Sequence, residues 1–135
     1  MKKLNCIMLI DDNKDDNFFH ERVIRKNNCA EKIISMESGK AALEYLRSET
    51  FESHSPPELI FLDINMPGMS GWEFLDEYDK LDQELKSKVI VTMLTTSDNP
   101  DDVAKAAALC PSPLKEFRTK PLTKEMLEEI IGRYF

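Results

Sequence analysis

Five polar side chains stand directly after short apolar runs, and their types suit the binding of a metal ion and an anion. They are Asp11, Asp12, Asp63, Thr95 and Lys120. The runs that precede them have the pattern of strands in a parallel sheet, where the carboxyl ends of all strands meet at one edge. We therefore expect these five side chains to lie close together, although they are far apart in the sequence.

Three carboxylates in one place would repel one another, and their pKa values would rise unless a cation lay among them. A set of oxygen donors without histidine or cysteine favours a hard ion, which is Mg²⁺ or, alternatively, Mn²⁺. A lysine and a hydroxyl beside the metal supply the positive charge and the hydrogen-bond donors that a phosphoryl group needs. A carboxylate in that setting can act as the nucleophile that forms an acyl phosphate.

Each residue also has a plain structural interpretation when it is taken alone. Asp63 precedes a Pro67-Gly68 turn and could simply cap it. The Asp11-Asp12 pair could be a solvated loop, and Thr95 could be a strand-end hydroxyl bonded to the backbone. Only their joint occurrence at strand ends favours a pocket.

The composition limits the classes of protein to which this chain can belong. The chain has 135 residues, a net charge of −7 and 41% hydrophobic residues, which is typical of one globular domain. We expect no nucleic-acid partner, because there is no basic stripe, and no membrane span, because no apolar run is long enough. The apolar run after Met1 is too short for a signal peptide. Three separated cysteines without C-x-x-C spacing favour reduced thiols and a cytoplasmic location.

Strand and helix patterns alternate along the chain, which predicts a three-layer α/β fold with a parallel sheet. The five expected strands are Cys6–Ile10, Lys32–Met36, Leu59–Leu62, Lys88–Leu94 and Lys115–Thr119. The five expected helices run from Asp15 to about Asn27, after Ser38, over Trp72–Leu81, over Asp101–Leu109 and after Thr123. Long irregular segments are expected at Ser48–Glu58 and Cys110–Leu114. There is no linker, so residues 1–135 are expected to form a single domain that ends at Phe135 without an output domain.

Several other side chains are expected to be structural. In the first helix Phe19, Val23 and Ile24 recur at helical spacing and predict its apolar face. His20 and His54 have no partners at ligand spacing and are expected at the surface. Trp72 is expected in or near the core, although an interface role is the alternative.

The five side chains stand in four motifs, which follow one another as I-D-D-N, L-D-I-N-M-P-G-M-S-G, M-L-T-T-S and T-K-P-L. In this order the motifs resemble those of response-regulator receiver domains, and the resemblance covers essentially the whole chain. The resemblance implies a doubly wound sheet with the strand order 2-1-3-4-5. It also implies two-component signalling, in which a sensor histidine kinase or a phosphotransfer protein phosphorylates the receiver.

Carried over to this sequence, the resemblance assigns a role to each motif. Asp63 would accept the phosphoryl group. Asp12, Asp63 and the backbone carbonyl of Asn65 would bind Mg²⁺ directly, and Asp11 would bind it through water. Lys120 would pair with the phosphoryl group, and the Lys120–Pro121 peptide bond would be cis.

The resemblance further implies a conformational switch. Thr95 would move to donate a hydrogen bond to the phosphoryl group, and the ring of Phe117 would turn into the vacated space. An output protein supplied in trans would then read the surface of the fourth helix, fifth strand and last helix. Asn65 and Ser97 are candidates for tuning self-dephosphorylation, which would not make the protein a turnover enzyme.

Three rival functions remain open from the sequence. A phosphohydrolase with an aspartyl-phosphate intermediate usually needs a second acid where this chain has Asn65, and it needs a cap domain. An interaction module of the same fold would work without phosphorylation, although all five pocket residues are present. A flavodoxin-like cofactor binder is disfavoured, since the first loop is acidic rather than a phosphate cradle.

Overall fold

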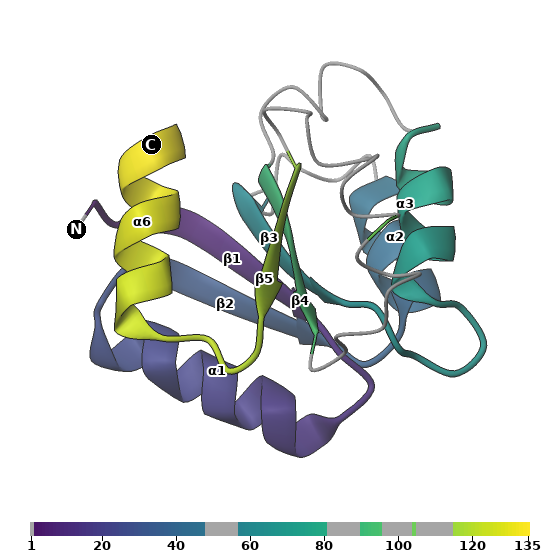
Figure 1. Ribbon diagram of the computed structural model, residues 1–135, viewed down its shortest axis with the longest axis horizontal. Helices are drawn as coiled ribbons and strands as arrows, with labels where there is room; N and C mark the ends of the chain where they lie inside the picture. Colours follow the sequence, from purple (N-terminus) through teal and green to yellow (C-terminus); the bar gives the residue numbers. More distant parts are fainter. Residues whose placement is uncertain (1, 48–56, 81–89, 96–103, 105–114) are drawn as a thin grey trace.

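A five-stranded parallel sheet lies between two layers of helices (Figure 1). The computed structural model describes residues 2–47, 57–80, 90–95, 104 and 115–135. The strands are β1 (Leu4–Ile10), β2 (Ala30–Met36), β3 (Leu59–Asp63), β4 (Ile90–Thr95) and β5 (Lys115–Thr119). The helices whose two ends lie in the described residues are α1 (Lys14–Lys26), α2 (Gly39–Arg47), α3 (Gly71–Tyr78) and α6 (Lys124–Tyr134). The strand order β2-β1-β3-β4-β5 confirms the predicted α/β fold.

Apart from Asn5 in β1 and Asp63 at the end of β3, the central strands β1 and β3 are apolar, because both of their faces are buried. Successive side chains of a strand point to opposite faces. Met8 and Ile10 accordingly join one core cluster, whereas Ile7 and Leu9 join the other. This arrangement leaves the ends of β1 and β3 side by side at the carboxyl edge of the sheet, where Ile10 is paired with Leu62.

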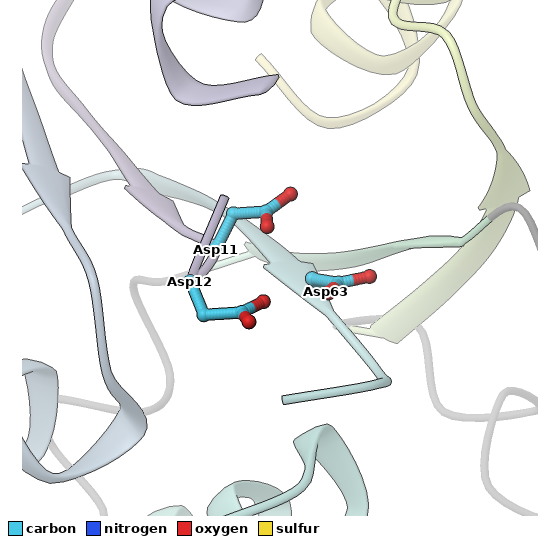
Figure 2. A group of neighbouring side chains, drawn as sticks. All are labelled: Asp11, Asp12 and Asp63. Atoms are coloured by element: carbon cyan, nitrogen blue, oxygen red, sulfur yellow. The ribbon is translucent and has the colours of Figure 1, made fainter. Parts of the chain in front are cut away.

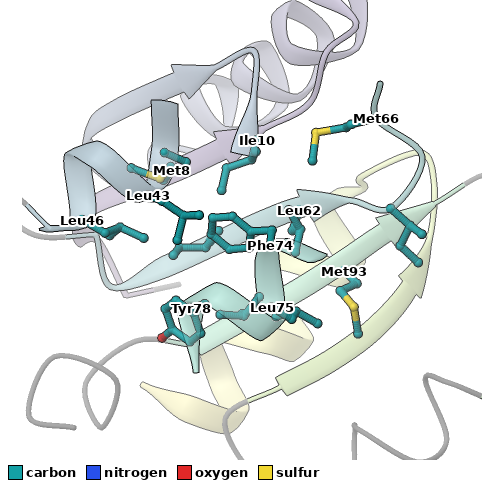
Figure 3. Packing of buried hydrophobic residues seen from close by; sticks show 14 residues of the cluster. Met8, Ile10, Leu43, Leu46, Leu62, Met66, Phe74, Leu75, Tyr78 and Met93 are labelled. Carbon is teal, nitrogen blue, oxygen red and sulfur yellow. The ribbon is translucent and has the colours of Figure 1, made fainter. Parts of the chain in front are cut away.

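The layer of α2 and α3 covers one face of the sheet. Figure 3 shows Phe74, Leu75 and Tyr78 of α3 packed with Leu43 of α2 over the strands. Trp72 is half-buried against this cluster, as expected for a residue near the core. Ser70 caps α3 in a capping box with Glu73, which fixes where the helix begins after the loop from β3.

The layer of α1 and α6 covers the other face, and here two sequence predictions were wrong. Phe19 is 48% exposed rather than part of the apolar face of α1, and His20 is buried rather than at the surface. Ile24 is buried as expected. The inward face therefore carries Asn17, His20 and Ile24, because the Asn17 amide bonds the backbone of the sheet edge, as described below.

The other described ends of helices and strands agree with the predicted ends to within a few residues. Ser38 and Thr123 accept hydrogen bonds from the first turns of α2 and α6, as their predicted capping role requires. Helix α3 ends at Tyr78. The predicted helix Asp101–Leu109 and the segment Cys110–Leu114 lie outside the described residues except for position 104, and so does nearly all of the predicted loop Ser48–Glu58, together with His54.

Candidate functional site

Three carboxylates converge at the carboxyl edge of the sheet, as the sequence predicted. Asp11 and Asp12 follow β1, and Asp63 is the last residue of β3. One oxygen from each lies within 4.8 Å of the others. Figure 2 shows the carboxylates of Asp11 and Asp12 extending toward the side of Asp63. Asp12 is exposed, whereas Asp11 and Asp63 are buried, so the cluster opens to solvent on one side. Such a set of oxygen donors fits a hard divalent cation.

The end of β1 is held in place by backbone hydrogen bonds. The Asp11 N–H donates to the Met36 carbonyl of β2, and the Asp11 side chain accepts from the Asn13 N–H at 2.9 Å. The amide of Asn17 donates to the Asp11 carbonyl at 2.8 Å. Asn13 in turn caps α1. The acidic pair is therefore fixed between the sheet and the first turn of α1.

Lys120 reaches the cluster from the segment after β5. Its Nζ lies 2.7 Å from Asp11 Oδ2, 2.8 Å from Asp16 Oδ2 and 3.4 Å from Asp63 Oδ1. The Lys120–Pro121 peptide bond is cis, as the family resemblance implied. The structure thus brings four of the five predicted pocket side chains together.

Burial dominates the electrostatics of Asp63. Desolvation and the neighbouring charge of Asp11 raise the pKa of Asp63 to about 6, although Lys120 opposes this shift. Burial alone would lower the pKa of Lys120, but hydrogen bonds to Asp11 and Asp16 raise it above the ordinary lysine value. Lys120 is therefore cationic at neutral pH, while the ionised form of Asp63 is disfavoured unless more positive charge is supplied.

The raised pKa of Asp63 predicts a pH-dependent stability in the presence of a chelator. The pKa of Asp63 is about 6 in the folded protein and exceeds the ordinary 3.8, so folding favours the protonated carboxyl group. The contribution of this group to the free energy of unfolding is therefore complete below pH 3.8 and is lost as the pH rises through 6. We expect Asp63→Asn to be more stable than the wild type at pH 7.5 by about 2 kcal/mol, and to lose this advantage near pH 4. Urea denaturation of both proteins across this range measures the difference, and a pH-independent difference would contradict the shift.

Comparison with known protein families identifies the family to which this chain belongs. A family model described as the response regulator receiver domain matches residues 7–132. The chain is a member of that family.

Two relatives and one solved structure illustrate the similarity. Response regulator Rcp1 of Synechocystis sp. is 37% identical over 98 residues, which are 72% of this chain and 65% of Rcp1, just under two thirds of its length. Two-component response regulator ARR17 of Arabidopsis thaliana is 31% identical over 130 residues, covering 92% of this chain and 80% of ARR17. The crystal structure of a two-component response regulator from Cytophaga hutchinsonii has a TM-score of 0.85 at 36% identity and covers 98% of both chains.

Membership in this family identifies the chain as a two-component response regulator receiver and not a turnover enzyme. Receiver domains are phosphorylated by histidine kinases. The acidic triad fits the Mg²⁺ site of a receiver. In the part of the chain that the structure describes, every helix is too short or too polar to cross a bilayer.

Three other predicted site residues have described backbone positions in this receiver. Thr95 ends β4 and is paired with Thr119 of β5, and Phe117 is paired with Met93. Asn65 follows Asp63 by two residues and is exposed. The side chains of Thr95 and Phe117 lie outside the described part of the structure, so their switching roles stay predictions.

Sequence reasoning missed three residues of α1 that face the pocket. Asp16 was assigned only to the first turn of the helix, yet it bonds Lys120. Asn17 and His20 were not assigned to the site, although both are buried beside Asp11 and Asp63. Desolvation and the charge of Lys120 lower the pKa of His20, which keeps it neutral at pH 7. Residues 16, 17 and 20 share one helical face, but the sequence does not show that this face, rather than the one that carries Phe19, meets the pocket.

Proposed function

We propose that Asp63 is the phospho-acceptor of this receiver and that a histidine kinase or phosphotransfer protein is its donor. The observation that carries the proposal is the position of the Asp63 carboxylate at the end of β3, beside the acidic pair and 3.4 Å from the Lys120 ammonium. In the transfer, an Asp63 oxygen forms a bond to phosphorus while the N–P bond of the donor breaks. The electron pair of that bond returns to the imidazole nitrogen of the donor.

Asp11, Asp12, Asp63 and the backbone carbonyl of Asn65 would hold Mg²⁺, with Mn²⁺ as the alternative ion. When bound, the metal supplies positive charge that offsets the repulsion among the carboxylates and the phosphoryl oxygens. Lys120 adds a fixed cation beside Asp63, and it is positioned to pair with a phosphoryl oxygen there. The exposed side of the pocket at Asp12 gives the donor access.

Phosphorylation would change the surface that an output protein reads. Thr95 lies at the end of β4, next to the strand that carries Asp63. Its hydroxyl would donate to the phosphoryl group, and Phe117 on β5 would repack in response. The resulting change would reach the surface formed by the fourth helix, β5 and α6. No nucleic-acid or membrane contact is part of this proposal.

Intact mass spectrometry with acetyl phosphate and Mg²⁺ tests the proposal. We expect the protein to gain the mass of one phosphoryl group, to lose it on treatment with hydroxylamine, and to gain nothing when EDTA replaces Mg²⁺. Acetate leaves in this reaction as the new O–P bond forms on the protein. A protein that stays unmodified with acetyl phosphate and excess Mg²⁺ would instead be a phosphorylation-independent interaction module of the same fold.

A further inference from the structure

Lys120 is shared among three carboxylates, and the phospho-acceptor is not its nearest partner. Its Nζ is hydrogen-bonded to Asp11 at 2.7 Å and to Asp16 at 2.8 Å, whereas Asp63 lies at 3.4 Å. The lysine side chain is only 9% exposed, so it has little water as an alternative partner. The ammonium is therefore drawn toward α1 and away from Asp63.

The start of α1 explains why Asp16 is the second partner and Asp15 is not. Asn13 caps the helix and accepts hydrogen bonds from the N–H groups of both aspartates. Consecutive helical residues point about 100° apart. Asp16 is half-buried next to the buried Asn17, whereas Asp15 is exposed to solvent. Only Asp16 therefore faces Lys120.

Asp16 also differs from Asp11 in its relation to the metal cluster. Asp11 belongs to the triad whose oxygens lie within 4.8 Å of one another, and Asp16 does not. A cation in the triad would draw on the Asp11 carboxylate and weaken its pull on Lys120. Asp16 would keep its full charge for the lysine. It is thus the carboxylate that competes with a phosphoryl group for the Lys120 ammonium.

On the basis of the proposed function, we propose that Asp16 is a positioning residue that holds Lys120 on the α1 side of the pocket and so opposes phosphorylation of Asp63. The phosphoryl oxygens must draw the ammonium from Asp16 before they gain its charge. The Asp16 carboxylate also repels an incoming dianionic donor. Both effects act in the same direction.

The expected effect of removing the Asp16 charge is a gain in reactivity. We expect Asp16→Asn to be phosphorylated by acetyl phosphate at saturating Mg²⁺ about fivefold faster than the wild type, which corresponds to about 1 kcal/mol. Affinity for beryllofluoride, a phosphoryl mimic that needs no chemical step, should rise by a similar factor. Asp16→Glu keeps the charge and should return both values toward the wild type.

Asp15→Asn is the matched control. It makes the same chemical change in the same helical turn, alters the net charge equally, and affects a side chain that faces solvent. We expect its phosphorylation rate and beryllofluoride affinity to stay close to those of the wild type. Circular dichroism and urea denaturation of each variant confirm that the proteins compared are folded.

The outcomes separate this inference from the function on which it rests. A faster Asp16→Asn beside unchanged Asp15→Asn and Asp16→Glu supports it. Equal rates for Asp16→Asn and Asp15→Asn, with only a loss of stability in the former, would mean that Asp16 merely supports the fold. A slower Asp16→Asn would mean that it holds the lysine productively. Either result overturns the inference while leaving Asp63 as the acceptor, whereas a wild type that takes up no phosphoryl group overturns both.

Discussion

Replacing Asp63 with asparagine is expected to abolish phosphoryl uptake from acetyl phosphate completely while the protein stays folded. The amide has the same shape as the carboxylate but lacks its nucleophilic oxygen. It also removes one of the three carboxylates that would hold the metal. Intact mass after incubation with acetyl phosphate and Mg²⁺ measures the effect, which should be all or none.

The folded state of the Asp63→Asn variant follows from the charges around this side chain. Burial and the charge of Asp11 disfavour the ionised form of Asp63, so a neutral amide relieves an unfavourable interaction. Asp76→Asn is a suitable control, because Asp76 is exposed on α3 and its carboxylate is not part of the acidic triad. This variant should be phosphorylated as the wild type is. A phosphoryl adduct that persisted in Asp63→Asn would place the acceptor on another carboxylate and refute the assignment.

The main features of the fold could be predicted because they depend on regular patterns. Cys6–Ile10 and Leu59–Leu62 are short and apolar at every position, which is typical of a strand covered on both faces. The structure places them as neighbouring central strands. Once both runs are parallel strands, the acids that follow them must meet at one edge. The triad of Asp11, Asp12 and Asp63 was therefore predictable from strand ends alone.

The orientation of α1 could not be predicted in the same way. Hydrophobic spacing placed Phe19 inside and left His20 outside, but the structure has them reversed. The cause is polar, since Asn17 turns inward to donate to the carbonyls of Asp11 and Met36. A residue that satisfies buried carbonyls behaves as a core residue, although its hydropathy predicts exposure.

The orientation of α1 that buries Asn17 also explains why the contact of Asp16 with Lys120 was not predicted. Acidic residues near a helix N-terminus already have an explanation in the helix dipole. The sequence therefore offered no reason to separate Asp16 from Asp15. Their difference comes from the position of Lys120, 104 residues away along the chain, whose ammonium reaches only one of them. Such a contact depends on tertiary structure and leaves no local signal.

Replacing Gly71 with alanine is expected to destabilise the protein and to slow phosphorylation at the same time. Gly71 begins α3 where it crosses the end of β3, and its N–H donates to the Ile64 carbonyl at 2.8 Å. A Cβ at this position would lie 2.6 Å from the Asp63 carbonyl oxygen and 2.8 Å from the Ile64 Cα. Both contacts are with backbone, so no side chain can rotate away. Either α3 or the segment that carries Asp63 must shift.

We expect Gly71→Ala to lower the free energy of unfolding by about 1–3 kcal/mol, as overpacking of a close contact does. Gly132→Ala is the matched control, because Gly132 lies on the exposed side of α6 and a Cβ there meets nothing within 4 Å. That variant should gain about 0.5–1 kcal/mol, since alanine favours the helix over glycine. Urea denaturation and the rate of phosphorylation by acetyl phosphate measure both variants. If Gly71→Ala lost stability but kept the wild-type rate, α3 would have moved instead of Asp63, and the close contact would serve the fold rather than the position of the acceptor.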